Sequence, residues 1–246
     1  MAELVAAVAA YLVLGVFVES RGWPKELAWS RSLGLLKGAA FGAGIIAMCV
    51  GALALLGVYR VQRINSRYDP WMALLTVGLA TAVAEEIIMR GVLFRLVEEW
   101  LGTWGAVAVS GAIFGAAHLF NPDGSIWGSL ALAVEAGLLF AAVYVLTRSL
   151  WWSMGLHFGW NVVQGPVFGS IVSGDGQTQS WLVAAWRGPD ILTGGVFGLE
   201  GSVVPVILGA LLGLGILVYA QRQGVVVVPR WRRLWLADRL TPPSAK

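Results

Sequence analysis

Long apolar windows limit what this chain can fold into more than any local motif does. A helix needs about 20 largely apolar residues to cross a bilayer core of about 30 Å. Suitable windows lie at residues 3–19, 38–59, 71–101, 103–120, 126–149, 151–173 and 202–221. We therefore predict an all-α, polytopic transmembrane helix bundle of seven spans. Residues 20–37 mix Lys and Arg with Trp and Leu, which predicts an interfacial helix or part of an eighth span.

Composition supports a membrane protein. Apolar residues make up 58% of the chain and charged residues 13%, which excludes the ordinary soluble class. No linker or internal repeat divides the sequence, so we expect one membrane-embedded domain over residues 1–246. The first window lacks a basic n-region and a convincing cleavage site, which predicts a retained helix rather than a signal peptide. Cys49 is the only cysteine, which excludes an internal disulfide, and no basic module interleaved with aromatics indicates nucleic-acid binding.

Basic residues predict the orientation of the bundle. Lys and Arg concentrate in cytoplasmic loops, and the segment after residue 221 carries Arg222, Arg230, Arg232, Arg233, Arg239 and Lys246. We expect a cytoplasmic C-terminus, with the first loop on the same side. Arg60, Arg63 and Arg67 then fall on the far side, against the rule. Residues 174–201 are less apolar and predict a long connecting loop, half re-entrant, on that side.

Three charged residues lie in the middle of the third window, in TAVAEEIIMR at 81–90. Ionisable residues in a span are costly, and they usually face a cavity in which they function. On an α-helix, Glu86 and Arg90 share a face and can form an ion pair, whereas Glu85 points about 100° away from Glu86. We interpret Glu86 and Arg90 as a structural pair and Glu85 as a working carboxylate. The alternative is one buried cluster of all three charges with no chemistry.

Both histidines of the chain lie inside predicted spans, in FGAAH ending at His118 and HFGWN beginning at His157. Glu85 lies 17 residues before Gly102 and His118 lies 16 after it, so an antiparallel hairpin brings the two to one level. There they can hold one water for general-base hydrolysis. His157 and Asn161 stand four residues apart and can offer N–H donors to an oxyanion. Tilt or a break in the fifth span must bring His157 to the level of His118.

Other residues in the spans are interpreted as structural. Glu135 lies in the middle of a span, where we favour a hydrogen-bond network with Arg90 or a histidine over direct catalysis. Phe114, one turn before His118, is expected to pack against the imidazole and fix its rotamer. Trp151 and Trp152 are expected to be interfacial anchors.

Three motifs carry a family resemblance. EEIIMR, FGAAH and HFGWN fit EExxxR, FxxxH and HxxxN, in order and each on its own span. Together they resemble the signature motifs of the CPBP family, the CAAX-prenyl-protease-like intramembrane proteases, also called the Abi family. The resemblance covers residues 71–165, and LTGGVFGLEGS before the last span also looks like a family feature. It implies a protease-like core at 71–220.

The resemblance implies an intramembrane endopeptidase that hydrolyses a membrane-associated or peptide substrate. The implied roles are base for Glu85, water activation for His118, oxyanion site for His157 and Asn161, and support for Glu86 and Arg90. It also implies a multi-pass protein of a prokaryotic inner or plasma membrane, with the lipid bilayer and a peptide or membrane-protein substrate as its partners.

Three alternatives stay open at this point. Family members are often described as metalloproteases, and a zinc-dependent form would use Glu85, His118 and His157 as ligands. We favour the metal-free form, with no cofactor, because a compact HExxH helix is absent and Asn161 suits an oxyanion donor pair. Buried Glu and His also build proton-coupled transporters, and a non-catalytic immunity or scaffold protein can keep the same motifs.

Overall fold

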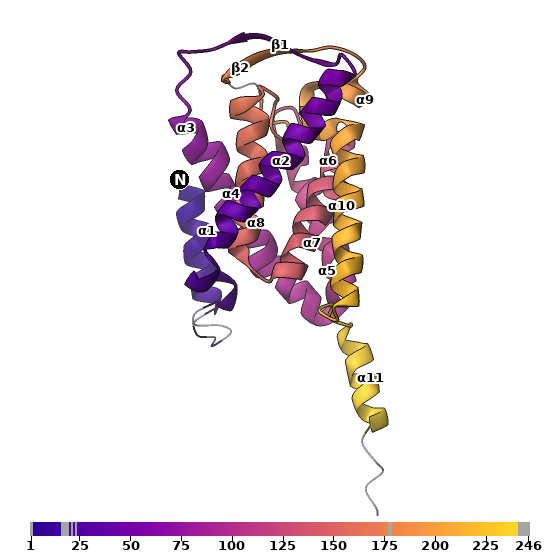
Figure 1. Cartoon of the computed structure of the whole chain (residues 1–246). Coiled ribbons are helices and arrows are strands. Elements are labelled where there is room, and N and C mark those ends of the chain that lie inside the picture. Colours follow the sequence, from indigo (N-terminus) through magenta and orange to yellow (C-terminus); the bar gives the residue numbers. More distant parts are fainter. Residues whose placement is uncertain (1, 16–19, 21, 23, 177–178, 241–246) are drawn as a thin grey trace, which may run out of the picture.

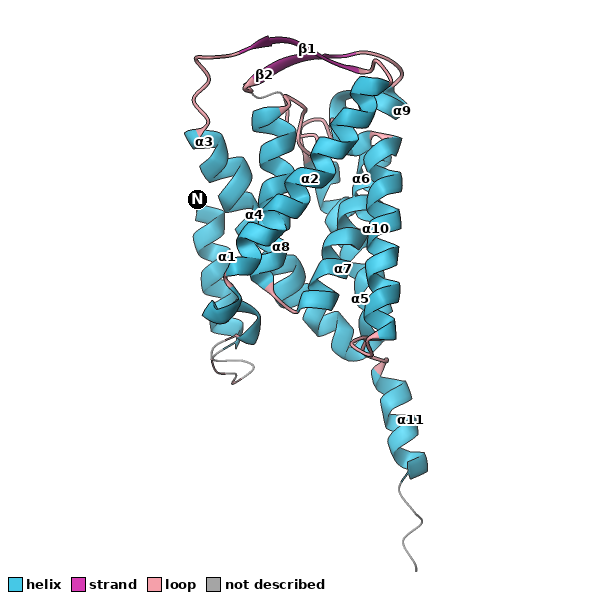
Figure 2. Ribbon diagram, viewed as in Figure 1, coloured by secondary structure: helices cyan, strands magenta, loops and turns pink. Residues whose placement is uncertain are grey.

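Helices built from the apolar windows form a bundle that is capped at one end by a small sheet (Figures 1 and 2). The computed structural model describes residues 2–15, 20, 22, 24–176 and 179–240. The helices are α1 (Ala2–Val13), α2 (Leu33–Leu55), α3 (Trp71–Ala73), α4 (Thr81–Glu86), α5 (Arg95–Ala117), α6 (Ile126–Leu132), α7 (Leu138–Thr147), α8 (Leu150–Val162), α9 (Asp190–Thr193), α10 (Val203–Arg222) and α11 (Arg230–Leu240). The strands β1 (Tyr59–Ile64) and β2 (Leu182–Trp186) pair antiparallel.

Four helices among the described residues are long and apolar enough to cross a membrane: Trp29–Leu55, Trp71–Phe120, Ile126–Thr147 and Val203–Arg222. The second is 50 residues long and is interrupted at Gly102, where φ is 72° and ψ is 176°. The predicted windows 71–101 and 103–120 are therefore the two limbs of one helical segment. The chain is mostly helical and integral to a membrane, but the predicted total of seven spans is not confirmed. The expectation of one domain stays a prediction.

Two connecting segments differ from their predictions. Residues 174–201 were expected to form a loop, half re-entrant, yet they contain β2, α9 and two short 3-10 turns, and β2 pairs with β1. Within residues 20–37 the structure has 3-10 turns at Lys25–Leu27 and Trp29–Arg31 before α2 begins, rather than one interfacial helix. Residues 21 and 23 lie outside the described part.

Glycines set the closest helix packing, between α2 and α8. A Cβ added at Gly38 or Gly42 would lie 2.3 or 2.2 Å from the backbone oxygens of Trp152 and Leu156. From the other side, a Cβ at Gly159 would lie 2.1 Å from the Ala39 oxygen. Small residues four apart let helix backbones touch inside a membrane, where lipid gives no hydrophobic drive to associate. This contact fixes α8, which carries His157 and Asn161.

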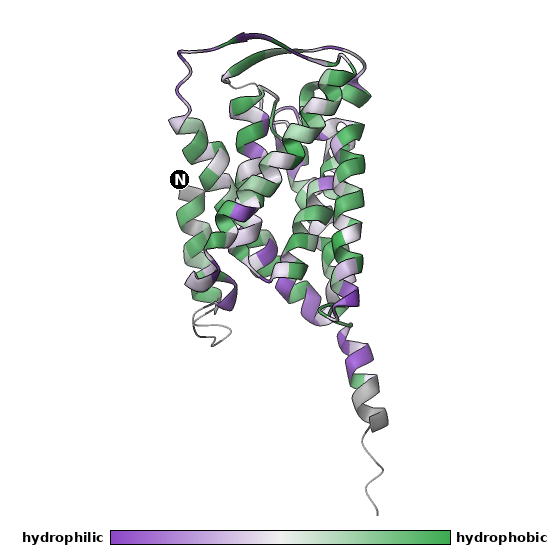
Figure 3. Ribbon diagram, in the orientation of Figure 1, coloured by the Kyte–Doolittle hydropathy of each residue, from purple (hydrophilic) through white to green (hydrophobic). Residues whose placement is uncertain are grey.

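Polar and charged groups collect at the end of the bundle opposite the strands. Glu98 on α5 accepts a hydrogen bond from Thr103 Oγ1 (2.6 Å) and pairs through both oxygens with the guanidinium of Arg148. Burial lowers the pKa of Arg148, but the hydrogen bonds and charge of Glu98 outweigh that effect and raise it above its usual value. Figure 3 shows hydrophobic residues along most of the helices and hydrophilic ones concentrated in α11, which leaves the bundle at this end.

Within the described residues, π-helical segments interrupt the helices at Leu74–Ala80, Ile87–Phe94, Ala133–Gly137 and Val163–Val167. The first two flank α4, the short α-helical stretch that carries Glu85 and Glu86. A regular α-helix was assumed across this region, and that assumption is wrong outside α4. Such wide turns are frequent at functional sites because they shift side chains around the helix axis.

Candidate active site

A pocket of about 320 Å³ gathers the polar residues singled out from the sequence. Glu85 from α4, His118 at the end of α5, and His157 and Asn161 from α8 all line it. Further lining comes from Thr81 and Val77 and from two loops, with Asn121, Val172, Ser173, Asp175 and Gly176. Glu85 and Asn161, which are 76 positions apart in the sequence, thus meet around one space.

Glu86 is buried next to Glu85 and accepts hydrogen bonds from two side chains. Its Oε1 accepts a hydrogen bond from Arg90 Nη1 at 2.9 Å and another from His157 Nδ1 at 3.1 Å. Glu86 and Arg90 are both fully buried. The Arg90 guanidinium also lies 5.2 and 5.5 Å from the ring centres of Phe114 and Phe140. The predicted structural pair is therefore present, and it also holds His157, a link that the sequence did not predict.

The two imidazoles present their Nε2 atoms for chemistry. His118 Nδ1 lies 2.7 Å from the Phe114 carbonyl oxygen, which can only accept a hydrogen bond, so the proton is on Nδ1. Nε2 of a neutral His118 then carries a lone pair. His157 Nδ1 donates to Glu86, and its Nε2 lies 3.9 Å from Glu85 Oε2. Both rings pack against Phe114, at 4.7 and 6.2 Å between ring centres.

Glu85 differs from its neighbour in exposure and contacts. Its side chain is 32% exposed, against 0% for Glu86. Its Oε2 atom has no hydrogen-bond partner among the described residues. A carboxylate that faces a polar pocket with a free lone pair can accept a proton from water there.

Asn161 is held by the π-helical segment before α4. Its Nδ2 donates to the Val77 carbonyl at 3.1 Å, which leaves the second amide hydrogen for a ligand in the pocket. Asn161 is 3% exposed and His157 is 4% exposed. These two side chains lie one helical turn apart on α8, as their spacing predicts.

Glu200 is a buried carboxylate that the sequence reasoning did not single out. Its Oε1 accepts from Trp160 Nε1 at 2.9 Å, and its Oε2 accepts from Gln164 Nε2 at 3.1 Å. The N–H and hydroxyl of Ser173, which lines the pocket, donate to the same Oε2 at 2.5 and 2.8 Å. Glu200 therefore joins α8 to the loop that forms one wall of the pocket. The only sequence signal was its place in LTGGVFGLEGS.

Glu135 does not make the network expected of it. It is fully buried, and neither of its carboxylate oxygens has a hydrogen-bond partner in the described part of the chain. The predicted bond to Arg90 or a histidine is absent because Glu86 and the Phe114 and Phe140 rings surround Arg90 instead. Glu135 packs beside Gly209 of α10, where an added Cβ would lie 2.9 Å from its own Cβ.

The donors around the pocket do not form a metal site in this arrangement. No three His, Cys, Asp or Glu side chains of the described residues are arranged to hold one. Glu85 and His157 approach each other across the pocket, but their nearest atoms are 3.9 Å apart, and the three predicted ligands do not form a chelating group in this arrangement.

The comparisons with known proteins bear on the same part of the chain. A family model described as Type II CAAX prenyl endopeptidase Rce1-like matches residues 67–163. Residues 67–163 are therefore similar to this family of CAAX proteases. The match contains all three motifs and ends two residues after Asn161, so the family region holds every predicted catalytic residue. Comparisons with curated proteins and with solved structures gave no match.

The CAAX protease assignment covers the two limbs around Gly102, α6, α7 and α8. Glu200 and the loop that contains Ser173 lie beyond the matched residues. Ser173 lines the pocket, and Glu200 accepts a hydrogen bond from its hydroxyl. The family implies a protease, and therefore a hydrolase, with its site inside a membrane protein.

Proposed function

We propose that this chain is an intramembrane endopeptidase in which Glu85 and His118 activate water and His157 and Asn161 stabilise the oxyanion. One observation carries the proposal: these four side chains, from separate helical segments, line a single pocket of about 320 Å³. Each faces that pocket with a group suited to its role. The substrate is a peptide or the exposed segment of a membrane protein.

In the first step, Glu85 accepts a proton from a water molecule held between its carboxylate and His118 Nε2. The oxygen of that water attacks the carbonyl carbon of the scissile peptide bond. General-base assistance of this kind contributes about 10²- to 10⁴-fold to rate. His118 can accept a hydrogen bond from the water because its own N–H is committed to the Phe114 carbonyl.

The attack converts the carbonyl oxygen into an oxyanion, which Asn161 and His157 receive. Asn161 has one amide hydrogen free of the Val77 bond. His157 donates through Nε2 in its imidazolium form, in which Nδ1 still donates to Glu86. When the intermediate collapses, the C–N bond breaks and the proton on Glu85 passes to the leaving amine. A new carboxyl terminus and a new amino terminus result.

The test is cleavage of a peptide library by purified protein in liposomes. We expect Glu85→Gln and His118→Ala each to reduce the cleavage rate by 10²-fold or more. Glu99→Gln is the matched control, because Glu99 lies near the far end of the bundle on α5 and is exposed. Wild-type rates in both pocket variants would refute the proposal.

A chelator arm in the same assay separates two forms of this mechanism. We propose the metal-free form, for which a chelator leaves activity unchanged. Loss of activity that zinc alone restores would assign Glu85, His118 and His157 to a metal ion instead, and the pocket would then rearrange to bring them together.

We also propose that the protein lies in a prokaryotic cell membrane with α11 on the cytoplasmic side. Arg230, Arg232 and Arg233 on α11 support this orientation through the positive-inside rule. The pocket is lined by loops at the end of the bundle that carries the strands, so substrate would then enter from the outer side.

A further inference from the structure

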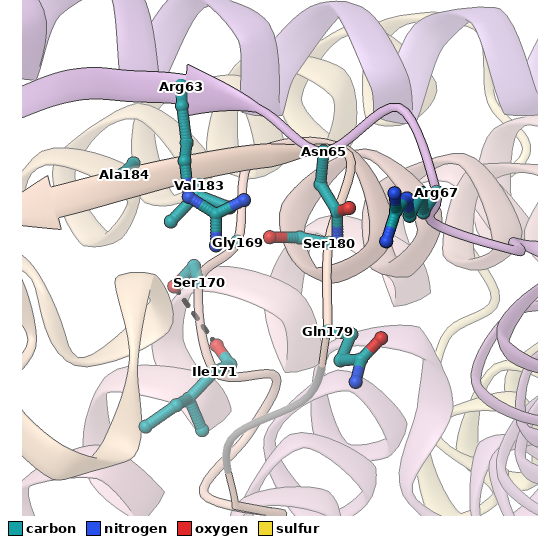
Figure 4. Close-up of a pocket in the computed structure, with 10 residues that line it drawn as sticks. All are labelled: Arg63, Asn65, Arg67, Gly169, Ser170, Ile171, Gln179, Ser180, Val183 and Ala184. Carbon is teal, nitrogen blue, oxygen red and sulfur yellow. Dashed lines mark hydrogen bonds between the residues drawn. The ribbon is translucent and has the colours of Figure 1, made fainter.

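A second pocket, of about 440 Å³, lies beneath β1 (Figure 4). Arginines line it, whereas carboxylates line the first pocket. Arg63 on β1 extends toward Ser170, Asn65 lies next to Ser180, and Arg67, in the segment that follows β1, lies to the side of Asn65 (Figure 4). The position is held by the sheet, in which Arg63 pairs with Val183 and the Asn65 N–H donates to the Trp181 carbonyl at 2.8 Å.

The pocket concentrates positive charge with no counter-charge. Two guanidinium groups line it, and its lining contains no carboxylate. Neither Arg63 nor Arg67 takes part in any ion pair found among the described residues. Around the two cations lie the amide donors of Asn65 and Gln179, whereas the Ser180 hydroxyl already donates to the Leu182 carbonyl. Guanidinium forks with nearby amide donors suit the oxygens of a phosphate group.

These arginines stand where the charge rule predicts few of them. They lie at the end of the bundle opposite α11 (Figure 1). Arg63 precedes the family match and Arg67 is its first residue, and the proposed mechanism uses neither side chain. Large apolar residues are exposed beside them, with Ile64 at 61%, Trp71 at 68% and Trp181 at 51%. Exposed Trp among basic residues is typical of the headgroup level of a bilayer.

We propose that this pocket binds the phosphate of an anionic lipid headgroup, with Arg63 and Arg67 as the principal ligands. The same phosphate chemistry exists in soluble esters, but the exposed tryptophans and Ile64 place acyl chains beside the site. The inference does not depend on proteolysis, because binding is measured without substrate. It is independent of the catalytic residues, none of which lines this pocket.

The experiment is native mass spectrometry of the purified full-length chain in detergent, titrated with phosphatidylglycerol or with phosphatidylcholine of the same acyl chains. We expect tight retention of phosphatidylglycerol by the wild type. An arginine near an anionic headgroup contributes about fivefold in affinity, so Arg63→Gln/Arg67→Gln should weaken binding roughly 20- to 30-fold. The matched control is Arg60→Gln/Arg187→Gln, which removes two exposed charges from the same sheet region outside the pocket.

Specific outcomes would overturn the proposal. Unchanged binding in the pocket variant, or an equal loss in the control variant, would leave only non-specific surface charge. Equal retention of glycerol phosphate would remove the lipid as the source. The same titration is run with peptides that carry a free terminal carboxylate and with their amidated forms. If Arg63→Gln/Arg67→Gln loses binding only of the free-carboxylate peptides, the pocket is a peptide site instead. Unchanged melting temperatures in both double variants show that the fold is kept, as expected for exposed side chains.

Discussion

Glu85 and Glu86 are adjacent, yet packing gives them different environments. Glu86 is fully buried and accepts hydrogen bonds from Arg90 and His157, whereas the Glu85 side chain is 32% exposed and faces the pocket. Removing one partner from a buried ion pair strands the other charge in a low-dielectric interior. Glu85 is partly exposed and its nearest cationic group, His157 Nε2, lies 3.9 Å away, so its removal strands a charge less than removal of Glu86 does.

The two carboxylates should therefore separate stability from activity. We expect Glu86→Gln to lower the free energy of unfolding by about 3 kcal/mol, because Arg90 is left buried without a counter-charge. Glu85→Gln should change it by less than about 0.5 kcal/mol while abolishing cleavage. Unfolding of each variant by denaturing detergent, followed by circular dichroism, measures the difference. Equal destabilisation by the two variants would contradict the assigned roles.

Glu200 is the residue whose importance is visible only in three dimensions. Its carboxylate accepts four hydrogen bonds, from Trp160, Gln164 and the N–H and hydroxyl of Ser173. No sequence pattern connects it with α8, since it lies 40 residues from Trp160. Its charge, rather than its size, is what lets one side chain accept so many donors.

We expect Glu200→Gln to loosen the pocket wall at residues 170–176. A neutral amide offers one acceptor oxygen, and its NH₂ meets donors instead of acceptors, so the Ser173 bonds are lost. Hydrogen–deuterium exchange should rise in this segment while α2 and α5 keep their protection. Glu99→Gln is the control. Exchange in the segment that matches the wild type would show that Glu200 does not hold the wall.

At the scale of elements, the α2–α8 contact positions the helix that carries His157 and Asn161. Gly38, Gly42 and Gly159 let the two backbones meet, and His157 lies on α8 within this contact. A side chain at these points must push the helices apart, because the nearest atoms are backbone atoms. Separation of α8 would move His157 and Asn161 away from Glu85.

Gly38→Val should therefore reduce both stability and activity, with a loss of about 2–3 kcal/mol from overpacking. Gly44→Val on the same helix is the matched control, because an added Cβ there meets nothing within 4 Å. Both changes place the same β-branched residue in α2, so helix propensity cancels. Denaturing-detergent titration and peptide cleavage are measured on each, and similar losses in the two would show that propensity, not packing, is responsible.

Much of the candidate site could be predicted from the sequence, because residues four positions apart lie on the same face of a helix. The four-residue intervals from Glu86 to Arg90 and from His157 to Asn161, and the hairpin about Gly102, are local. What could not be predicted depends on side chains that meet through the fold. The Glu86–His157 hydrogen bond and the hydrogen bonds of Glu200 join elements far apart in the chain. Glu135 has no hydrogen-bond partner among the described residues, and this too depends on how distant elements pack. The strands were missed because β1 and β2 have partners more than 100 residues away.

For the whole molecule, the basic residues near α11 and those near β1 favour opposite orientations in the membrane. The α11 end collects Arg222, Arg230, Arg232 and Arg233, and the opposite end exposes Arg60, Arg63 and Arg67. The larger group should dominate insertion, since basic residues near span ends set the topology. A phosphate site at β1 would explain why the smaller group persists there.

Orientation can be measured with single cysteines, because the one native thiol, Cys49, is fully buried. We expect a membrane-impermeant maleimide to label Arg60→Cys in intact bacterial cells and to label Arg232→Cys only after the membrane is opened. The wild type, with Cys49 alone, reports background labelling. The reverse pattern would place α11 outside and the pocket entrance on the cytoplasmic side, so that a substrate would have to reach Glu85 from within the cell.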